Sequence, residues 1–298
     1  MTSLDFDNIF KCKDLSPSSI QIYKTKFKKL NDDKPIRNIN FILEMDKIKQ
    51  KIAHLKPNTQ RTYYIAICSV LKCLINDKQA NKKIIAIYNQ YSKILDEYNI
   101  KLKDQTTKTE TEDNNWISQD NLKEIYDNLK LKHKESQRAF QDYLILSLYY
   151  LTPPRRNKDY VLLKVIANYN DKLPNDFNYI DMKNKKFYFN NYKTAKKYNQ
   201  QSLDIPQELF NIIDEYIKTF KIKFNDYLLY DINTNEPLNT SNAMTLILNK
   251  IFKKKISSSM LRKLYLTNKY GDKAQELKND VANMGTSVST AQNNYIKS

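Results

Sequence analysis

Apolar residues recur at helical spacing through most of the first hundred positions. They predict four helices joined by short connections, which would pack as a small bundle. The predicted helices cover about residues 20–30, 39–55, 60–74 and 79–98. Ser16 or Ser18 is positioned to cap the first of them.

The stretch from 101 to 115 is polar and alternates threonines with charged residues. It lacks an apolar period, so it predicts an interdomain linker. We therefore expect a helical domain over 1–100 and a second domain over 116–298, whose first helix would be capped by Ser118.

The second domain begins with helical patterns, which are followed by short strand-like runs. Residues 140–151 are apolar nearly all round, as in a buried helix, and a pair of prolines at 153–154 ends that helix. Short strand-like runs follow at 179–182, 187–192 and 202–205, and the pattern is helical again from 207. The predicted fold class is mainly α, with a small antiparallel β-sheet in the second domain.

The chain has 298 residues and a net charge of +17, which indicates a polyanionic partner, most simply nucleic acid. A lysine-rich proteome would produce part of the same bias. The distribution adds information: residues 1–100 carry 18 basic and 10 acidic side chains, against 32 and 23 in the longer remainder. The first hundred residues are thus about twice as dense in net positive charge, as expected of a domain that closes over DNA.

Several classes of protein are disfavoured. The chain lacks both an uninterrupted apolar run of about 18 residues and a signal peptide, so we expect no membrane span and no membrane partner. An odd number of cysteines without close pairing favours a reduced, intracellular compartment. His54 and His133 are the only histidines and lack paired ligands, so no metal or other cofactor is expected.

A basic chain of this kind contains the residue types needed to cleave a DNA phosphate without metal. Arginine remains charged and binds the phosphate oxygens through a planar fork. Arg155, directly after the proline turn, and Arg262, on a later helix, are the candidate pair. Arg156 competes with Arg155 for the same role.

The reaction also needs a nucleophile and an acid for the leaving 5′ oxygen. Tyr295 stands near the end of a polar, helix-like stretch where a core does not require an aromatic side chain. Lys193 follows the second strand-like run and is the candidate acid, with Lys196 and Lys197 as alternatives.

This ordered set resembles the tyrosine recombinases, or phage-type integrases, over nearly the whole chain. Their first arginine motif resembles Thr152-Pro153-Pro154-Arg155, and their hairpin lysine corresponds to Lys193. Their His-x-x-Arg box corresponds to Ser259-Met260-Leu261-Arg262, and their tyrosine-bearing ending to Met284–Tyr295. The Pro-Pro-Arg-Arg variant looks most like divergent members from mobile elements and large DNA viruses.

Two positions depart from the family pattern. Ser259 stands where the family has histidine, and Thr286 stands where it has histidine or tryptophan. Neither hydroxyl can exchange protons as imidazole does at neutral pH. If each loss costs about a hundredfold in rate, the usual size of such a contribution, the enzyme would be slow.

The resemblance implies a site-specific recombinase that forms a 3′-phosphotyrosyl link through Tyr295. It implies double-stranded DNA as partner, self-association on DNA from dimer to tetramer, an intracellular DNA compartment, and no cofactor. Two alternatives stay open: a catalytically degraded relative that binds DNA, and a type IB topoisomerase with the same tyrosine chemistry.

Overall fold

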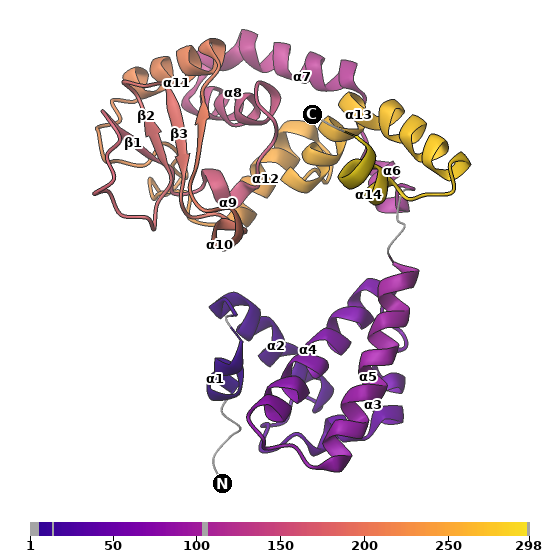
Figure 1. The fold of residues 1–298 in the computed structure, drawn as a ribbon. Coiled ribbons are helices and arrows are strands. Elements are labelled where there is room, and N and C mark those ends of the chain that lie inside the picture. Colours follow the sequence, from indigo (N-terminus) through magenta and orange to yellow (C-terminus); the bar gives the residue numbers. More distant parts are fainter. Residues whose placement is uncertain (1–5, 14, 103–106, 297–298) are drawn as a thin grey trace. The chain divides into compact units, whose positions relative to one another are not determined.

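The structure is a computed structural model that describes residues 6–13, 15–102 and 107–296. The chain divides into two compact units, Met1–Thr107 and Lys108–Ser298 (Figure 1). Each unit has its own hydrophobic core. Across these described ranges, every helix is too short or too polar to cross a bilayer.

The first unit is helical wherever the structure describes regular elements. Its helices are α1 (Phe6–Ile9), η1 (Phe10–Cys12), α2 (Pro17–Leu30), η2 (Asn40–Leu43), α3 (Met45–Ile52), α4 (Pro57–Asn76) and α5 (Lys82–Lys101). Ser16 caps α2 by accepting a hydrogen bond from the Ser19 amide, as the sequence predicted. The predicted helix over 39–55 is instead interrupted at Glu44, whose ψ of 72° is not helical, so that η2 and α3 are separate.

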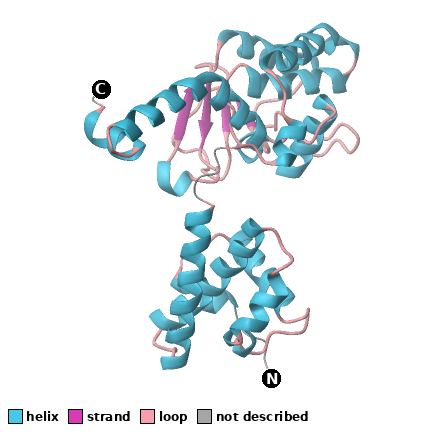
Figure 2. Ribbon diagram, turned by 90° about the vertical axis from the view of Figure 1, so that its right-hand side faces the viewer, coloured by secondary structure: helices cyan, strands magenta, loops and turns pink. Residues whose placement is uncertain are grey.

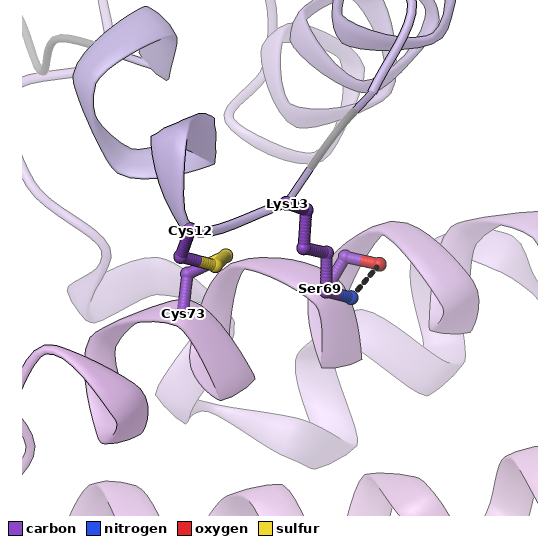
Figure 3. The surroundings of a disulfide bond; sticks show 4 residues. All are labelled: Cys12, Lys13, Ser69 and Cys73. Carbon is purple, nitrogen blue, oxygen red and sulfur yellow. Dashed lines mark hydrogen bonds between the residues drawn. A yellow bond between two sulfur atoms is a disulfide. The ribbon is translucent and has the colours of Figure 1, made fainter.

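A disulfide joins Cys12 of η1 to Cys73 of α4, with Cα atoms 5.6 Å apart (Figure 3). The expectation of reduced cysteines is therefore wrong for this pair. The two residues are 61 positions apart, and only the fold brings them together. Cys68 is free and buried, and burial raises the pKa of its thiol to about 11.

The second unit is mostly helix around a small sheet (Figure 2), so the mainly α fold class is confirmed. Its helices are α6 (Glu110–Asn115), α7 (Gln119–Lys132), η3 (His133–Glu135), α8 (Gln137–Tyr150), α9 (Asn157–Tyr160), α10 (Ala195–Tyr198), α11 (Gln207–Thr219), α12 (Ser241–Phe252), α13 (Ser258–Asn283), α14 (Val288–Thr290) and the π-helix η4 (Ala291–Tyr295). Ser118 caps α7, as predicted.

The sheet is mixed, which corrects the prediction of an antiparallel one. Its strands are β1 (Lys164–Ile166), β2 (Tyr179–Asp181), β3 (Lys186–Phe189) and β4 (Gln201–Asp204). They lie in the order β1-β2-β3-β4, with β1 parallel to β2 and the other neighbours antiparallel. At three residues, β1 is too short to show an alternating pattern, and its polar connection to β2 resembled a loop.

The core of this unit is organised around α8. Nine of its fourteen residues are buried, which agrees with the apolar pattern over 140–151. The helix packs against α7, α11 and α12, and it ends at Tyr150, just before the two prolines. The packing of this buried helix therefore fixes the position of the backbone that leads to Arg155.

Part of the predicted linker is ordered structure in the second unit. A capping box between Thr109 and Glu112 starts α6. Glu112 pairs with Lys263 of α13, and the side chain of Asn115 accepts a hydrogen bond from the Lys255 amide at 2.8 Å. The linker positions 103–106 lie outside the described residues.

Candidate functional site

Three arginines line one open cavity of about 500 Å³ in the second unit. Arg155 and Arg156 follow the proline turn that ends α8. Arg262 lies on the second turn of α13, where Leu261 and Leu264 are buried and hold this part of the helix against the core. The fold therefore brings together the predicted pair, Arg155 and Arg262, and adds Arg156.

The rest of the cavity wall comes from the proline turn, α9, and the β3–β4 region. These residues are Pro153, Pro154, Asp159, Tyr192, Thr194, Tyr198, Gln201 and Leu203. Among the described lining residues, Asp159 is the one carboxylate facing three guanidinium groups. Such an excess of positive charge favours an anionic ligand.

Arg155 is held in place by the protein. Its Nε donates to Asp159 Oδ2 at 2.9 Å, and its Nη1 donates to Gln201 Oε1 at 2.9 Å. Its guanidinium also stacks on the Phe189 ring, 3.9 Å from the centroid. The side chain is only 15% exposed. Two of the five N–H donors of this arginine are therefore used in bonds to the protein, and its ring contact fixes the plane of the guanidinium.

Asp159 has one satisfied and one unsatisfied oxygen. The residue is 2% exposed, and its Oδ1 has no hydrogen-bond partner among the described residues. Burial raises the pKa of this carboxyl, and the Arg155 guanidinium opposes part of that rise. A free acceptor thus remains at a site otherwise dominated by donors.

Arg156 and Arg262 are unpaired by comparison. In the part of the chain that the structure describes, no hydrogen bond or ion pair joins either guanidinium to a protein acceptor. Burial lowers the pKa of Arg262, and the positive charge of Arg156 lowers it further. An arginine stays protonated at neutral pH despite such a shift. These two groups are free to bind an external anion.

The predicted lysine lies beside the cavity but outside its lining. Lys193 is exposed in the turn after β3, between Tyr192 and Thr194, which both line the cavity. The alternatives Lys196 and Lys197 lie on the short helix α10. All three candidate lysines thus belong to the segment between β3 and β4, and the structure does not select among them.

Ser259, Thr286 and Tyr295 are also absent from the cavity lining. Ser259 is exposed on α13, one turn before Arg262. After α13, Gly285 at φ +67° reverses the chain, as a left-handed C-cap does, and Thr286 follows it. Tyr295 ends η4 and is 61% exposed.

Two contacts that shape the site were missed from sequence. Asp159 is four residues after Arg155, a spacing that permits an ion pair on one helical turn, and this signal was available. Gln201 is 46 positions from Arg155 and comes close only through strand pairing.

Comparisons with known proteins give weak similarities. No protein-family profile and no curated protein matches the chain. The structure is similar to XerA recombinase, with 13% identity and a TM-score of 0.37 over 88% of this chain and 81% of that one. It is also similar to the integrase from mycobacterium phage Brujita, with 9% identity and a TM-score of 0.31 over 88% and 76%. At these values the similarity does not assign an activity.

Across the described residues, no group of three or more histidine, cysteine and acidic side chains is arranged so that it could hold a metal ion.

Proposed function

We propose that this chain is a DNA strand transferase of the tyrosine-recombinase type, and that the arginine cavity binds a backbone phosphate. The observation that carries the proposal is the convergence of Arg155, Arg156 and Arg262 on one open cavity. Guanidinium groups bind phosphate through paired, charge-assisted hydrogen bonds.

In the proposed reaction, the exposed Tyr295 phenol gives its proton to solvent water, and its oxygen attacks phosphorus. The bond from phosphorus to the 5′ oxygen breaks, and Lys193 gives that oxygen a proton. The products are a 3′-phosphotyrosyl link and a 5′ hydroxyl. The arginines stabilise the negative charge that develops on the non-bridging oxygens. A 5′ hydroxyl from a partner strand reverses the step, so no external energy source is needed.

This chemistry sets a requirement on the C-terminal segment. Tyr295 is exposed and outside the cavity lining. DNA binding must therefore bring its phenol to the bound phosphate. Strand exchange also requires two DNA sites, so the proposal includes self-association on DNA, from dimer to tetramer.

A second candidate is a DNA-binding protein without strand-transfer activity. It is favoured by Ser259 and Thr286 at positions where the family has acid–base or ring side chains, and by the position of Tyr295. In this case the arginine cavity would bind phosphate and no covalent step would follow.

Of the two candidates, the strand transferase forms a covalent protein–DNA product and the DNA-binding protein does not. The full chain would be incubated with a pool of duplexes that carry random flanks and a nick, which traps a cleaved strand. We expect a denaturant-resistant protein–DNA adduct that mass spectrometry maps to Tyr295. Tyr295→Phe should abolish the adduct. Tyr270→Phe, which alters an exposed tyrosine on α13, should retain it. Salt-sensitive binding without any adduct would select the second candidate.

A further inference from the structure

The long helix α13 is anchored to the second unit along its first half. Four of its first seven residues are buried, the last of them Leu264. One turn further on, the side chain of Asn268 donates a hydrogen bond to Gln119 Oε1 at 2.7 Å. Among the described residues, no hydrogen bond or ion pair joins positions 269–296 to any part of the chain outside α13 and the segment that follows it. The anchored part therefore ends near Asn268.

Beyond this point the C-terminal segment packs on itself. The chain reverses after α13, where the Thr286 amide donates to the Val281 carbonyl at 2.8 Å, and α14 then contacts α13 (Figure 1). Val281 and Ala291 are both 4% exposed, yet neither belongs to the hydrophobic core of the unit. The second half of α13, α14 and η4 thus form a helical hairpin with Tyr295 at its end.

Gly271 lies where the anchored part of α13 gives way to this hairpin, three residues after Asn268. A glycine inside a helix lowers the stability of the helix relative to alanine, because it has more backbone freedom to lose. The packing does not require this glycine, since an added Cβ would meet only the Thr267 methyl carbon, at an ordinary contact distance of 3.6 Å. Local structure therefore leaves the choice of glycine unexplained.

From these observations we propose that Gly271 is a hinge, at which α13 bends when DNA binds and brings Tyr295 to the phosphate in the arginine cavity. The inference rests on the proposed function, which requires such a movement because Tyr295 is 61% exposed and absent from the cavity lining. The arm from Gly271 to Asn283 is about 18 Å long at the helical rise of about 1.5 Å per residue. A kink of about 30° would move its end by about 9 Å.

Gly271→Ala tests the hinge, because it stiffens the helix without a steric clash. The variant should melt at a higher temperature and keep the wild-type affinity for DNA. At saturating nicked DNA, its single-turnover rate of adduct formation on Tyr295 should fall about fivefold, which corresponds to the difference in helix propensity between glycine and alanine. A glycine with a merely structural role would not combine a gain in stability with a loss of rate.

Two further variants of α13 separate the hinge from the general stability of the helix. Asn279→Ala also raises the helix propensity, but on the arm beyond the hinge, and should leave the rate unchanged. The double variant Gly271→Ala/Ala274→Gly moves the glycine three residues along, still beyond Asn268. Ala274 is exposed, so this change leaves the core intact, and it should restore most of the rate.

The bend itself is measured by energy transfer from Trp116, the only tryptophan, which packs against the core of the second unit. A dansyl acceptor is attached through Asn283→Cys, at the exposed end of α13. Cys68 does not compete for the label, because it is buried and its thiol has a pKa of about 11. Nicked DNA should change the energy transfer, and Gly271→Ala should reduce that change.

The outcomes distinguish the hinge from the proposed function. Equal adduct rates and equal changes in energy transfer with and without Gly271→Ala would overturn the hinge and leave the proposed function intact. So would a Tyr295 adduct that forms without any change in energy transfer. If DNA binds and no adduct forms, strand transfer is overturned, and the energy transfer alone decides whether α13 bends at Gly271.

Discussion

Individual arginines at the cavity differ in what they already bind. Arg155 is engaged by Asp159 and Gln201, whereas Arg156 and Arg262 have no protein acceptor among the described residues. The residue with the strongest protein contacts is therefore suited to positioning, and the other two are suited to contact with an external phosphate.

This difference predicts opposite phenotypes for two adjacent alanine variants. Arg156→Ala should weaken DNA binding about tenfold to a hundredfold, since it removes a charge-assisted contact, and should leave the melting temperature unchanged. Arg155→Ala should lower the free energy of unfolding by about 3–5 kcal/mol, because it leaves the buried Asp159 without its partner.

Anisotropy and calorimetry measure the two effects. Arg138→Ala is the control, because Arg138 lies elsewhere in the same unit and bonds Asn233. Equal loss of stability in Arg155→Ala and Arg156→Ala would contradict the assignment.

Asp142 predicts a pH dependence of stability. Burial raises the pKa of its carboxyl to about 6, although Arg138 and Lys250 act in the opposite direction. The folded state binds this proton more tightly than the unfolded state. The stabilising contribution is therefore complete below about pH 4 and is lost as the pH rises through about 6.

Asp142→Asn should consequently be more stable than the wild type at pH 7, and the difference should shrink towards pH 4. Urea unfolding at a series of pH values measures this. A stability difference that does not change with pH would show that the carboxyl titrates normally.

At the scale of helices and strands, the sequence predicted those elements whose signals are local. The capping residues Ser16 and Ser118 predicted the starts of α2 and α7, and the nearly all-round apolar pattern over 140–151 predicted α8. It missed β1 and the break at Glu44, because three residues cannot show a period and a change in one ψ leaves the apolar spacing intact. The strand β1, for example, is defined by its pairing with β2, which lies further along the chain.

The disulfide should contribute to the stability of the first unit. It closes a loop between residues 61 positions apart, which stabilises by up to about 4 kcal/mol in the loop-entropy description. Cys12→Ser should lower the melting temperature of this unit and make it insensitive to dithiothreitol. Cys68→Ala should retain the sensitivity to reductant, because Cys68 is outside the bond. A wild-type melting temperature that reductant does not change would contradict this role.

At the scale of the whole molecule, the net charge of +17 predicts a large electrostatic contribution to DNA binding. A protein that contacts six or more phosphates loses about a thousandfold or more in DNA affinity when the salt concentration rises from 50 to 200 mM. We expect a steep salt dependence of this kind, measured as log affinity against log salt. Arg156→Ala should reduce the slope by about one. A flat salt profile would exclude the phosphate backbone as the main ligand.

The candidate site was predictable only in part. The order of Arg155, Lys193, Arg262 and Tyr295 predicted a site for phosphotyrosyl chemistry, and that chemistry stays a prediction. The fold brings the two arginines together across 107 positions. The role of Asp159 and the exposed position of Tyr295 depend on tertiary packing, which residue order does not specify.

The helix α6 has a practical consequence for dividing the protein. A fragment that begins at Trp116, where the sequence placed the second domain, would lack Glu112 and Asn115 and with them the brace on Lys255 and Lys263. Lys263 adjoins Arg262, so this truncation should loosen the start of α13 and misplace one wall of the arginine cavity. A fragment that begins at Lys108 keeps these two contacts and should fold with the arginine cavity intact.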